Sequence, residues 1–399
     1  MKKKFLFMFC LSLTVITGCW DQAELDDITV VSAIAIDKGK EHKYRLTTEF
    51  FNVNALDPDT RGAETASIIF SLEGNTIAEL AKKMNVMATR KLIYSHMRVV
   101  VMSKEIAQEG LLEFLDFFEA DREIRNDFNF LVVDNVAAKD VLKINYPIQQ
   151  VSSLKIHEQL DTMVKEWGGD PDIRMKDFIV ALLSPGREPI APEVKVIGSP
   201  EQGKKRSNME KVEMDALVIL DGLAIFNGMK YVGQLPIKHV RNFLLLQDKL
   251  RRTSITTMCG EEKSMAARIT NSKTRVKARY DKDLPKFNVN IDLEGRLETI
   301  QCPIEIVDLQ AYLDMEKQFA KAFEKEIEET IRILQEDFQL DIFGFGEHME
   351  RQNYQQFKKV KDEWNEEFAK ANIDVNVTLK LRRTGLIHDP FLVEMEDEE

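Results

Sequence analysis

The residue in this chain with the clearest chemistry is Cys19, which stands where an uncharged run ends and an acidic segment begins. A cysteine thiol is nucleophilic enough to accept a lipid readily, and no other small side chain offers this chemistry. The three residues before it are Ile16, Thr17 and Gly18, a branched apolar residue followed by small ones. Glycine lets a peptidase approach the backbone closely. This spacing predicts cleavage before Cys19 and lipid on the new terminal cysteine.

The segment that precedes this cysteine is typical of an export signal. Lys2, Lys3 and Lys4 lead into an uncharged run of 12 residues at 5–16. A helix that spans a bilayer needs about 20 apolar residues, so this run is too short and fits a signal peptide that is later removed. Together with residues 16–19 it forms the lipobox pattern of bacterial lipoproteins. We predict a signal peptide at 1–18, with S-diacylglycerol and an N-acyl chain on Cys19. The alternatives are a buried N-terminal element and an ordinary signal with an incidental cysteine.

The composition limits the partners of the chain. Its 399 residues carry a formal net charge of −12, and loss of the three signal lysines makes the mature chain more acidic still. Nucleic-acid binding requires a basic face, so this class is excluded. The negative charge also disfavours binding to anionic lipid headgroups, so the lipid on Cys19 must anchor the protein. Hydrophobic residues make up 44% and charged residues 31%, which indicates a globular chain. No later run is long and apolar enough to predict a transmembrane helix.

No arrangement of residues in the sequence predicts catalysis. GxSxG, HExxH, P-loop and GxGxxG patterns are absent from the sequence. His96 could act as a base or a ligand, but a structural histidine is the preferred interpretation. Glu347-His348-x-Glu350 could suggest a metal, although such charges usually face solvent on a helix. We predict no catalytic, cofactor-binding or metal-binding residues and no cofactor other than the lipid on Cys19.

Three further features each have two interpretations. Asp121, Arg122, Glu123 and Arg125 form either an intramolecular ion-pair network or a patch that faces a partner. Gly344 and Gly346 either permit a turn between two helices or line a ligand loop. Two cysteines remain in the mature body, which is too few for a disulfide framework. We predict that Cys259 and Cys302 are separate reduced thiols, with a single bridge as the alternative.

Strand-like runs alternate with helical patterns in the first half of the chain. The predicted strands lie at 28–37, 44–53, 66–74, 92–102, 128–134 and 191–197. Thr76 is expected to cap one helix and Ser103 a longer one that reaches about Phe118, while 137–186 is mostly helical. This alternation predicts a mixed sheet with helices packed on it.

A polar segment at 198–214 divides the chain. It contains Gly, Pro, Ser and Lys and almost no apolar side chains, so we predict a linker there. The linker separates an N-terminal α/β region at 19–197, which forms one or two domains, from a C-terminal domain at 215–388. The acidic residues at 389–399 are expected to form a frayed tail.

The second half combines a hairpin, strands and long helices. Asn227-Gly228 between apolar runs is a strong hairpin signal. Three strand-like runs follow within 252–300, then a long amphipathic helix at 304–338, and a second helix that ends near Ala371. In the last strand, at 373–381, apolar and polar residues alternate, so one face is expected to be buried and the other exposed to solvent. The predicted fold class is α+β: mixed sheets packed with helices in two to three domains, with long amphipathic helices against a sheet in the C-terminal domain.

Several segments together resemble one known family. The segment GCWDQAELDDITVVSAIAID resembles the mature N-terminus of the Ger(x)C family, the C subunits of spore germinant receptors. The resemblance continues in RKLIYSHMRVVVMS, DREIR, DIFGFGEHM and WNEEFAKANIDVNVTLKLRRTGLI, and it spans nearly the whole chain. The family motif is filled here by Cys19, Trp20, Asp21, Glu24, Leu25 and Asp37.

The resemblance implies a function that composition alone does not. Members act as lipoproteins of the inner spore membrane, beside membrane-embedded A and B subunits, in a complex that senses nutrients and triggers germination. It therefore implies a non-enzymatic subunit of a germinant receptor, anchored by lipid at the outer face of the cell membrane or in the inner spore membrane. The alternatives are an independent solute-binding lipoprotein that delivers a nutrient to a membrane transporter, and an exported hydrolase. Whether this subunit binds a small-molecule germinant is left open.

Overall fold

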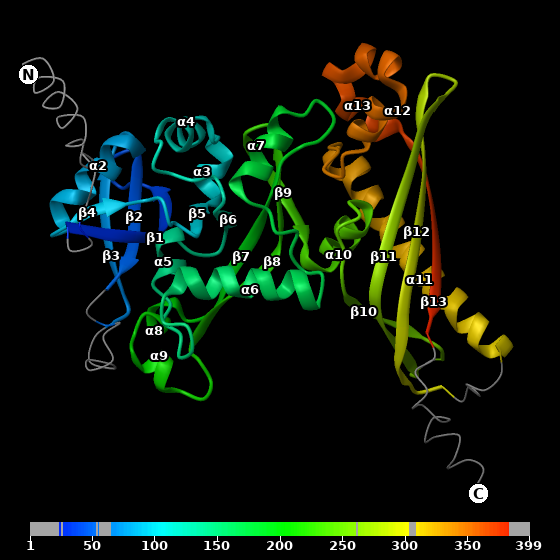
Figure 1. Cartoon of the computed structure of the whole chain (residues 1–399), viewed down its shortest axis with the longest axis horizontal. Helices are drawn as coiled ribbons and strands as arrows, with labels where there is room; N and C mark the ends of the chain where they lie inside the picture. The colour runs from blue at the N-terminus through cyan, green and yellow to red at the C-terminus, as the bar shows by residue number, and fades with distance from the viewer. Residues whose placement is uncertain are drawn as a thin grey trace, which may run out of the picture.

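The computed structural model describes residues 24, 27–52, 55, 65–260, 262–302 and 309–382 (Figure 1). The expected signal peptide, the lipobox with Cys19, the motif residues Trp20, Asp21 and Leu25, and the acidic tail all lie outside these residues. Within the described ranges, strands form two sheets, one of nine strands and one of four.

The larger sheet has a parallel centre and antiparallel edges. Its spatial order is β3-β2-β1-β5-β6-β7-β8-β9, and the short β4 also pairs with β1. The central strands β1, β5, β6 and β7 run parallel to one another, while the pairs β3/β2, β2/β1, β7/β8 and β8/β9 are antiparallel. The bounds are β1 (Ile28–Lys38), β2 (Tyr44–Phe51), β3 (Ser67–Gly74), β4 (Lys91–Ile93), β5 (Val99–Ser103), β6 (Asn129–Val133), β7 (Ile190–Gly198), β8 (Ala216–Asn227) and β9 (Lys230–Pro236).

Helices cover both faces of this sheet, which explains the nearly continuous apolar runs of its central strands. On β1, Ile34 and Ile36 join the core beneath one helical layer, while Ala33 and Ala35 join the core beneath the other. The first layer consists of α2 (Ile77–Met87), α3 (Lys104–Glu109), α4 (Leu112–Ala120) and α7 (Met175–Leu183). The second contains α5 (Ala138–Leu142), α6 (Ser152–Glu166), α8 (Pro200–Gly203) and α9 (Ser207–Glu210).

The smaller sheet is built on one long hairpin. β11 and β12 pair along almost their full length, β10 flanks β11, and β13 runs parallel to β12. The alternating burial of β12 places one face against α11 and the C-terminal helices. The bounds are β10 (Thr253–Met258), β11 (Ser264–Asp281), β12 (Leu284–Ile300), β13 (Asn372–Leu381), α11 (Leu309–Ile333), the π-helix η4 (Leu334–Phe338), α12 (Phe345–Val360), the 3-10 helix η5 (Lys361–Glu363) and α13 (Trp364–Lys370).

The hairpin of β8 and β9 belongs to the first sheet, because β8 pairs antiparallel with β7. The 198–214 segment therefore connects two neighbouring strands of one sheet, and it contains α8 and α9. The change from the first sheet to the second falls after β9, at α10 (Ile237–Leu246). Leu223 of β8, Leu245 of α10 and Phe287 of β12 belong to one continuous apolar core. The division into domains stays a prediction.

Most expected elements are present, and the α+β class with C-terminal helices against a sheet is confirmed. Thr76 caps α2, since its Oγ1 accepts a hydrogen bond from the Glu79 backbone N–H at 3.3 Å. Two expectations are wrong. The 92–102 run forms two strands, and the helix after Ser103 is divided at Gly110, where φ is +118° and only glycine is unstrained.

The C-terminal elements also depart from the sequence patterns. The single helix expected before Ala371 is interrupted by η5. Cys259 and Cys302 form a disulfide with a Cα–Cα distance of 6.3 Å, so the expectation of two separate thiols is wrong. The antiparallel pairing of β10, β11 and β12 brings the two cysteines together, and sequence separation alone gives no sign of that pairing.

Candidate functional site

Asp37 is the family-motif carboxylate that the structure places most clearly. It lies at the end of β1 and is 4% exposed. Its Oδ1 accepts a hydrogen bond from the Ala138 N–H at 2.6 Å, and its Oδ2 accepts one from the Lys139 N–H at 2.9 Å. Burial raises the pKa of this carboxyl, and the two backbone N–H groups oppose that rise. Asp37 therefore fixes the start of α5 against the sheet, which is a structural role.

Glu49 of β2 fixes the start of α6 against the sheet, as Asp37 does for α5. It is fully buried and accepts hydrogen bonds from the N–H groups of Ser152 and Ser153, at 3.1 and 3.2 Å. The Ser32 hydroxyl donates to the same carboxylate at 2.9 Å. Burial raises the pKa of Glu49. A sequence pattern could not identify this residue, because a lone glutamate in a strand is usually solvated.

Asp341 organises the junction between the first sheet and the C-terminal helices. Its carboxylate accepts from the N–H groups of Phe343, Gly344 and Gly346 and from the Trp364 Nε1–H, each at 2.9 Å. Burial raises its pKa to about 6 against the lowering effect of these donors. The turn interpretation of Gly344 and Gly346 is confirmed, since Gly344 has φ +81° and precedes α12.

The same turn contacts the segment after α7. The Glu188 N–H donates to the Asp341 carbonyl at 2.7 Å, and Arg187 Nε lies 3.2 Å from Glu347 Oε1. A Cβ on Gly346 would lie 2.5 Å from the Cα of Gly186, so the two glycines allow backbone-to-backbone contact. The conspicuous DIFGFGEHM segment therefore joins two parts of the molecule.

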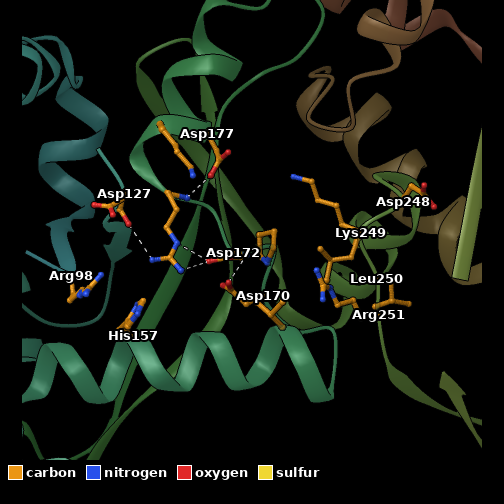
Figure 2. Close-up of a pocket in the computed structure, with 15 residues that line it drawn as sticks. Arg98, Asp127, His157, Asp170, Asp172, Asp177, Asp248, Lys249, Leu250 and Arg251 are labelled. Atoms are coloured by element: carbon orange, nitrogen blue, oxygen red, sulfur yellow. Dashed lines mark hydrogen bonds and ion pairs between the residues drawn. The ribbon is translucent and has the colours of Figure 1, made fainter. Parts of the chain in front are cut away.

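A charged cavity of about 710 Å³ opens beside this junction. Its walls come from α6, from the segment that leads into α7, and from the residues that follow α10 (Figure 2). The lining residues are Arg98, Asp127, His157, Val164, Asp170, Pro171, Asp172, Arg174, Lys176, Asp177, Leu244, Asp248, Lys249, Leu250 and Arg251. Its size is within the usual range for small-molecule sites.

Arg174 is held rigidly in this cavity. Its guanidinium forms an ion pair with Asp172 at 2.7 Å and donates to the Asp127 carbonyl at 3.2 Å. Its backbone N–H donates to Asp177 at 3.0 Å, which closes the first turn of α7. Nearby, His157 Nδ1 is 2.8 Å from Asn129 Oδ1, and burial lowers the pKa of His157. This shift favours the neutral imidazole.

The sequence patterns do not predict this cavity. The 170–176 segment, DPDIRMK, is dense in charge and follows Gly168-Gly169, which is a turn signal inside a region expected to be mostly helical. That signal could have identified a loop. No sequence pattern marks the residues at 248–251 as part of a site, because only the tertiary fold places them opposite Asp170.

Other residues singled out from the sequence do not converge on a site. His96 is exposed between β4 and β5, and Glu24 is exposed at the start of the described chain. His348 is partly buried, which lowers its pKa to about 4. Within the described ranges, no group of three or more His, Cys, Asp or Glu side chains could hold a metal ion. None of the helices described is long and apolar enough to cross a membrane.

In the charge cluster after α4, the two acidic residues form intramolecular ion pairs. Asp121 pairs with Lys82 at 3.7 Å and Glu123 with Lys91 at 3.1 Å. These contacts agree with the ion-pair interpretation of that cluster.

Comparison with known proteins identifies the family. Residues 21–196 match the family described as "Spore germination protein N-terminal domain", and residues 221–385 match "Spore germination B3/ GerAC like, C-terminal". The chain belongs to the Ger(x)C family of spore germination proteins. The two matches cover most of this Ger(x)C chain, including Glu24, Asp37 and the cavity, and they confirm the resemblance seen in the sequence.

Curated relatives match over nearly their full length. This Ger(x)C chain is similar to Spore germination protein KC of Bacillus subtilis (strain 168), with 28% identity over 399 residues and 98% of each chain covered. Spore germination protein B3 of the same organism is 23% identical and covers 96% of this chain and 98% of its own length. GerQC of Bacillus cereus is 23% identical, with 96% and 99% covered.

A solved structure shares the fold. The crystal structure of the GerBC protein covers 88% of this Ger(x)C chain and 97% of its own length, with a TM-score of 0.58 and 18% sequence identity. This likeness shows a common α+β architecture.

Proposed function

We propose that this chain is a lipid-anchored, non-enzymatic subunit of a membrane receptor complex that responds to germinants. Membership of the Ger(x)C family over both halves of the chain carries the proposal. The spacing of Ile16, Thr17, Gly18 and Cys19 supports an anchor of S-diacylglycerol and an N-acyl chain on Cys19. We place the protein at the outer face of the cell membrane or in the inner spore membrane, beside membrane-embedded A and B subunits.

The anchor is tested by Cys19→Ala in the native organism. Without the thiol no thioether lipid forms, so most of the protein should leave the membrane fraction, and germination should slow severalfold. The measurements are immunoblots of fractionated spores and the loss of optical density after nutrient addition. Cys10→Ala is the matched control, since Cys10 lies in the segment that is removed with the signal. Normal membrane retention and normal germination of Cys19→Ala would show that the anchoring role is wrong.

The complex is tested by crosslinking in spore membranes. We expect a multispanning, transporter-like chain to be recovered with this subunit. The second candidate function, an independent solute-binding lipoprotein, is favoured by one observation, the charged cavity of about 710 Å³. Recovery of the protein without a membrane-embedded chain, together with tight binding of a nutrient, would favour this second function.

A further inference from the structure

The cavity beside the junction carries unpaired positive charge inside an acidic protein. Among the described residues, no carboxylate lies within 4 Å of the side-chain nitrogens of Arg98, Lys176, Lys249 or Arg251. Among the acidic side chains of the lining, Asp172 pairs with Arg174, Asp248 pairs with Lys273, and Asp177 accepts the Arg174 backbone N–H. Desolvation and the neighbouring Arg187 lower the pKa of Lys249. Cations without an ion-pair partner in a shared cavity can attract an anion into the space between them.

The cations come from separate parts of the fold. Arg98 precedes β5, and Lys176 lies in α7, both in the first sheet and its helices. Lys249 and Arg251 lie between α10 and β10, where the second sheet begins. Figure 2 shows Arg98 and His157 on one side of Asp170, and Lys249 and Arg251 on the other side. The lining of the cavity therefore combines cations from both parts of the molecule.

Asp170 adds a second, independent sign of a ligand. Its side chain is fully buried, and its Oδ1 accepts a hydrogen bond from the Asp172 N–H at 2.7 Å. Its Oδ2 has no hydrogen-bond partner in the described structure. A buried carboxyl oxygen without a partner is costly, and such groups in native proteins usually face a ligand or water. Asp170 lines the cavity, so the missing donor can be supplied from there.

We propose that this cavity binds a small organic anion, a carboxylate or a phosphate ester, that also carries a hydroxyl or ammonium donor. The anionic group lies among Lys176, Lys249 and Arg251, and the donor bonds to Asp170 Oδ2. Arg174 is already fixed by Asp172 and gives the cavity a rigid wall. The inference does not depend on the lipid anchor or on the receptor complex, because every residue involved belongs to this chain.

The test is calorimetric titration of the full-length protein, purified in detergent, with defined probes. Succinate, malate, inorganic phosphate and glycerol 3-phosphate separate the two anion classes. Each pair also differs by hydroxyl donors: malate adds one to succinate, and glycerol 3-phosphate adds two to phosphate. We expect millimolar or tighter binding in one class, and tighter binding of its hydroxyl-bearing member. Charge-assisted hydrogen bonds are usually strong enough that loss of one weakens binding about tenfold.

Variants then assign the roles. Arg251→Gln and Lys249→Gln should each weaken both members of the bound pair about tenfold or more. Asp170→Asn should preferentially weaken the hydroxyl-bearing member, because the amide presents a different hydrogen-bonding group at the ligand side. Lys321→Gln, at an exposed lysine of α11 outside the cavity, is the matched control and should bind as the parent does. Thermal melting of each variant verifies that it is folded.

Two results would overturn the proposal. One is the absence of binding by all four probes at millimolar concentration. The other is binding that Arg251→Gln and Lys321→Gln weaken equally, since that would indicate adsorption to surface charge and not a site. Neither result bears on whether Cys19→Ala releases the protein from the membrane, so failure here and failure of the proposed function are distinguishable.

Discussion

At the scale of single residues, the structure depends on carboxylates that are buried where one helix, strand or turn contacts another. Asp37 and Glu49 accept the first N–H groups of α5 and α6, and Asp341 accepts those of the turn before α12. Each of these carboxylates is supplied with several donors, which offsets much of the cost of its burial. Asp170 differs from them because only one of its oxygens has a partner.

Asp170 should make stability depend on pH in a specific direction. Burial raises its pKa from 3.8 to about 7; the hydrogen bond from the Asp172 N–H opposes the rise, the Asp172 charge adds to it, and Arg174 opposes it. A carboxyl whose pKa is higher in the folded state stabilises the fold fully below about pH 4, and this contribution is lost as the pH rises to about 7. Asp170→Asn does not titrate. The unfolding free energy of the variant should therefore rise relative to the parent by roughly 2–4 kcal/mol over this interval.

The measurement for this prediction is urea unfolding of parent and variant at intervals between pH 4 and pH 8. Groups that do not interact with Asp170 titrate equally in both proteins, so the difference reports on Asp170 and its coupling to Asp172 and Arg174. Parallel stability curves across this range would contradict the prediction.

At the scale of elements, sequence patterns predicted the alternating strands and the helices with clear caps. They failed where long-range pairing decides the outcome. Nothing local in the 92–102 run shows that it forms two strands. β4 and β5 are separate because each pairs with a different part of β1 and a turn lies between them. The pairing of β8 with β7 could not be predicted either, because a hairpin signal predicts the turn between two strands and not the sheet that the hairpin joins. The cavity was unpredictable for the same reason, since its two sides are about 80 residues apart in the chain.

The turn before α12 makes a prediction about element packing. Gly346→Ala would place a Cβ 2.5 Å from Gly186 Cα and 2.6 Å from Trp364 Nε1, so backbone must move. We expect a loss of about 1–3 kcal/mol in unfolding free energy. Gly260→Ala is the matched control, because its nearest neighbour is Lys263 Cβ at 3.7 Å. Equal urea midpoints for the two variants would show that the close contact is not maintained in solution.

At the scale of the whole molecule, one apolar core joins the two sheets. It includes residues from β8, β9 and α10 together with residues from β11, β12 and the C-terminal helices. Burial of shared apolar surface makes the unfolding of one part expose the other, which couples them energetically. The 198–214 segment does not separate these parts, because it links β7 to β8 within the first sheet.

This shared core predicts a single cooperative unfolding transition. Far-UV circular dichroism reports both sheets, whereas tryptophan fluorescence reports strongly on Trp364, which is 3% exposed among the C-terminal helices. The two signals should give the same urea midpoint, as expected for coupled parts. Separate midpoints would instead support independent domains, with a boundary after β9.

The position of β1 has a geometric consequence for a protein anchored at Cys19. β1 begins at Ile28 and lies inside the larger sheet, between β2 and β5. An extended chain advances about 3.3–3.6 Å per residue, so the first sheet cannot be more than roughly 32 Å from the lipid attachment point. The long hairpin lies at the far end of the molecule from this sheet (Figure 1). If Cys19 carries the proposed lipid, the start of β1 is held within this distance of the bilayer, whereas the long hairpin has no such limit.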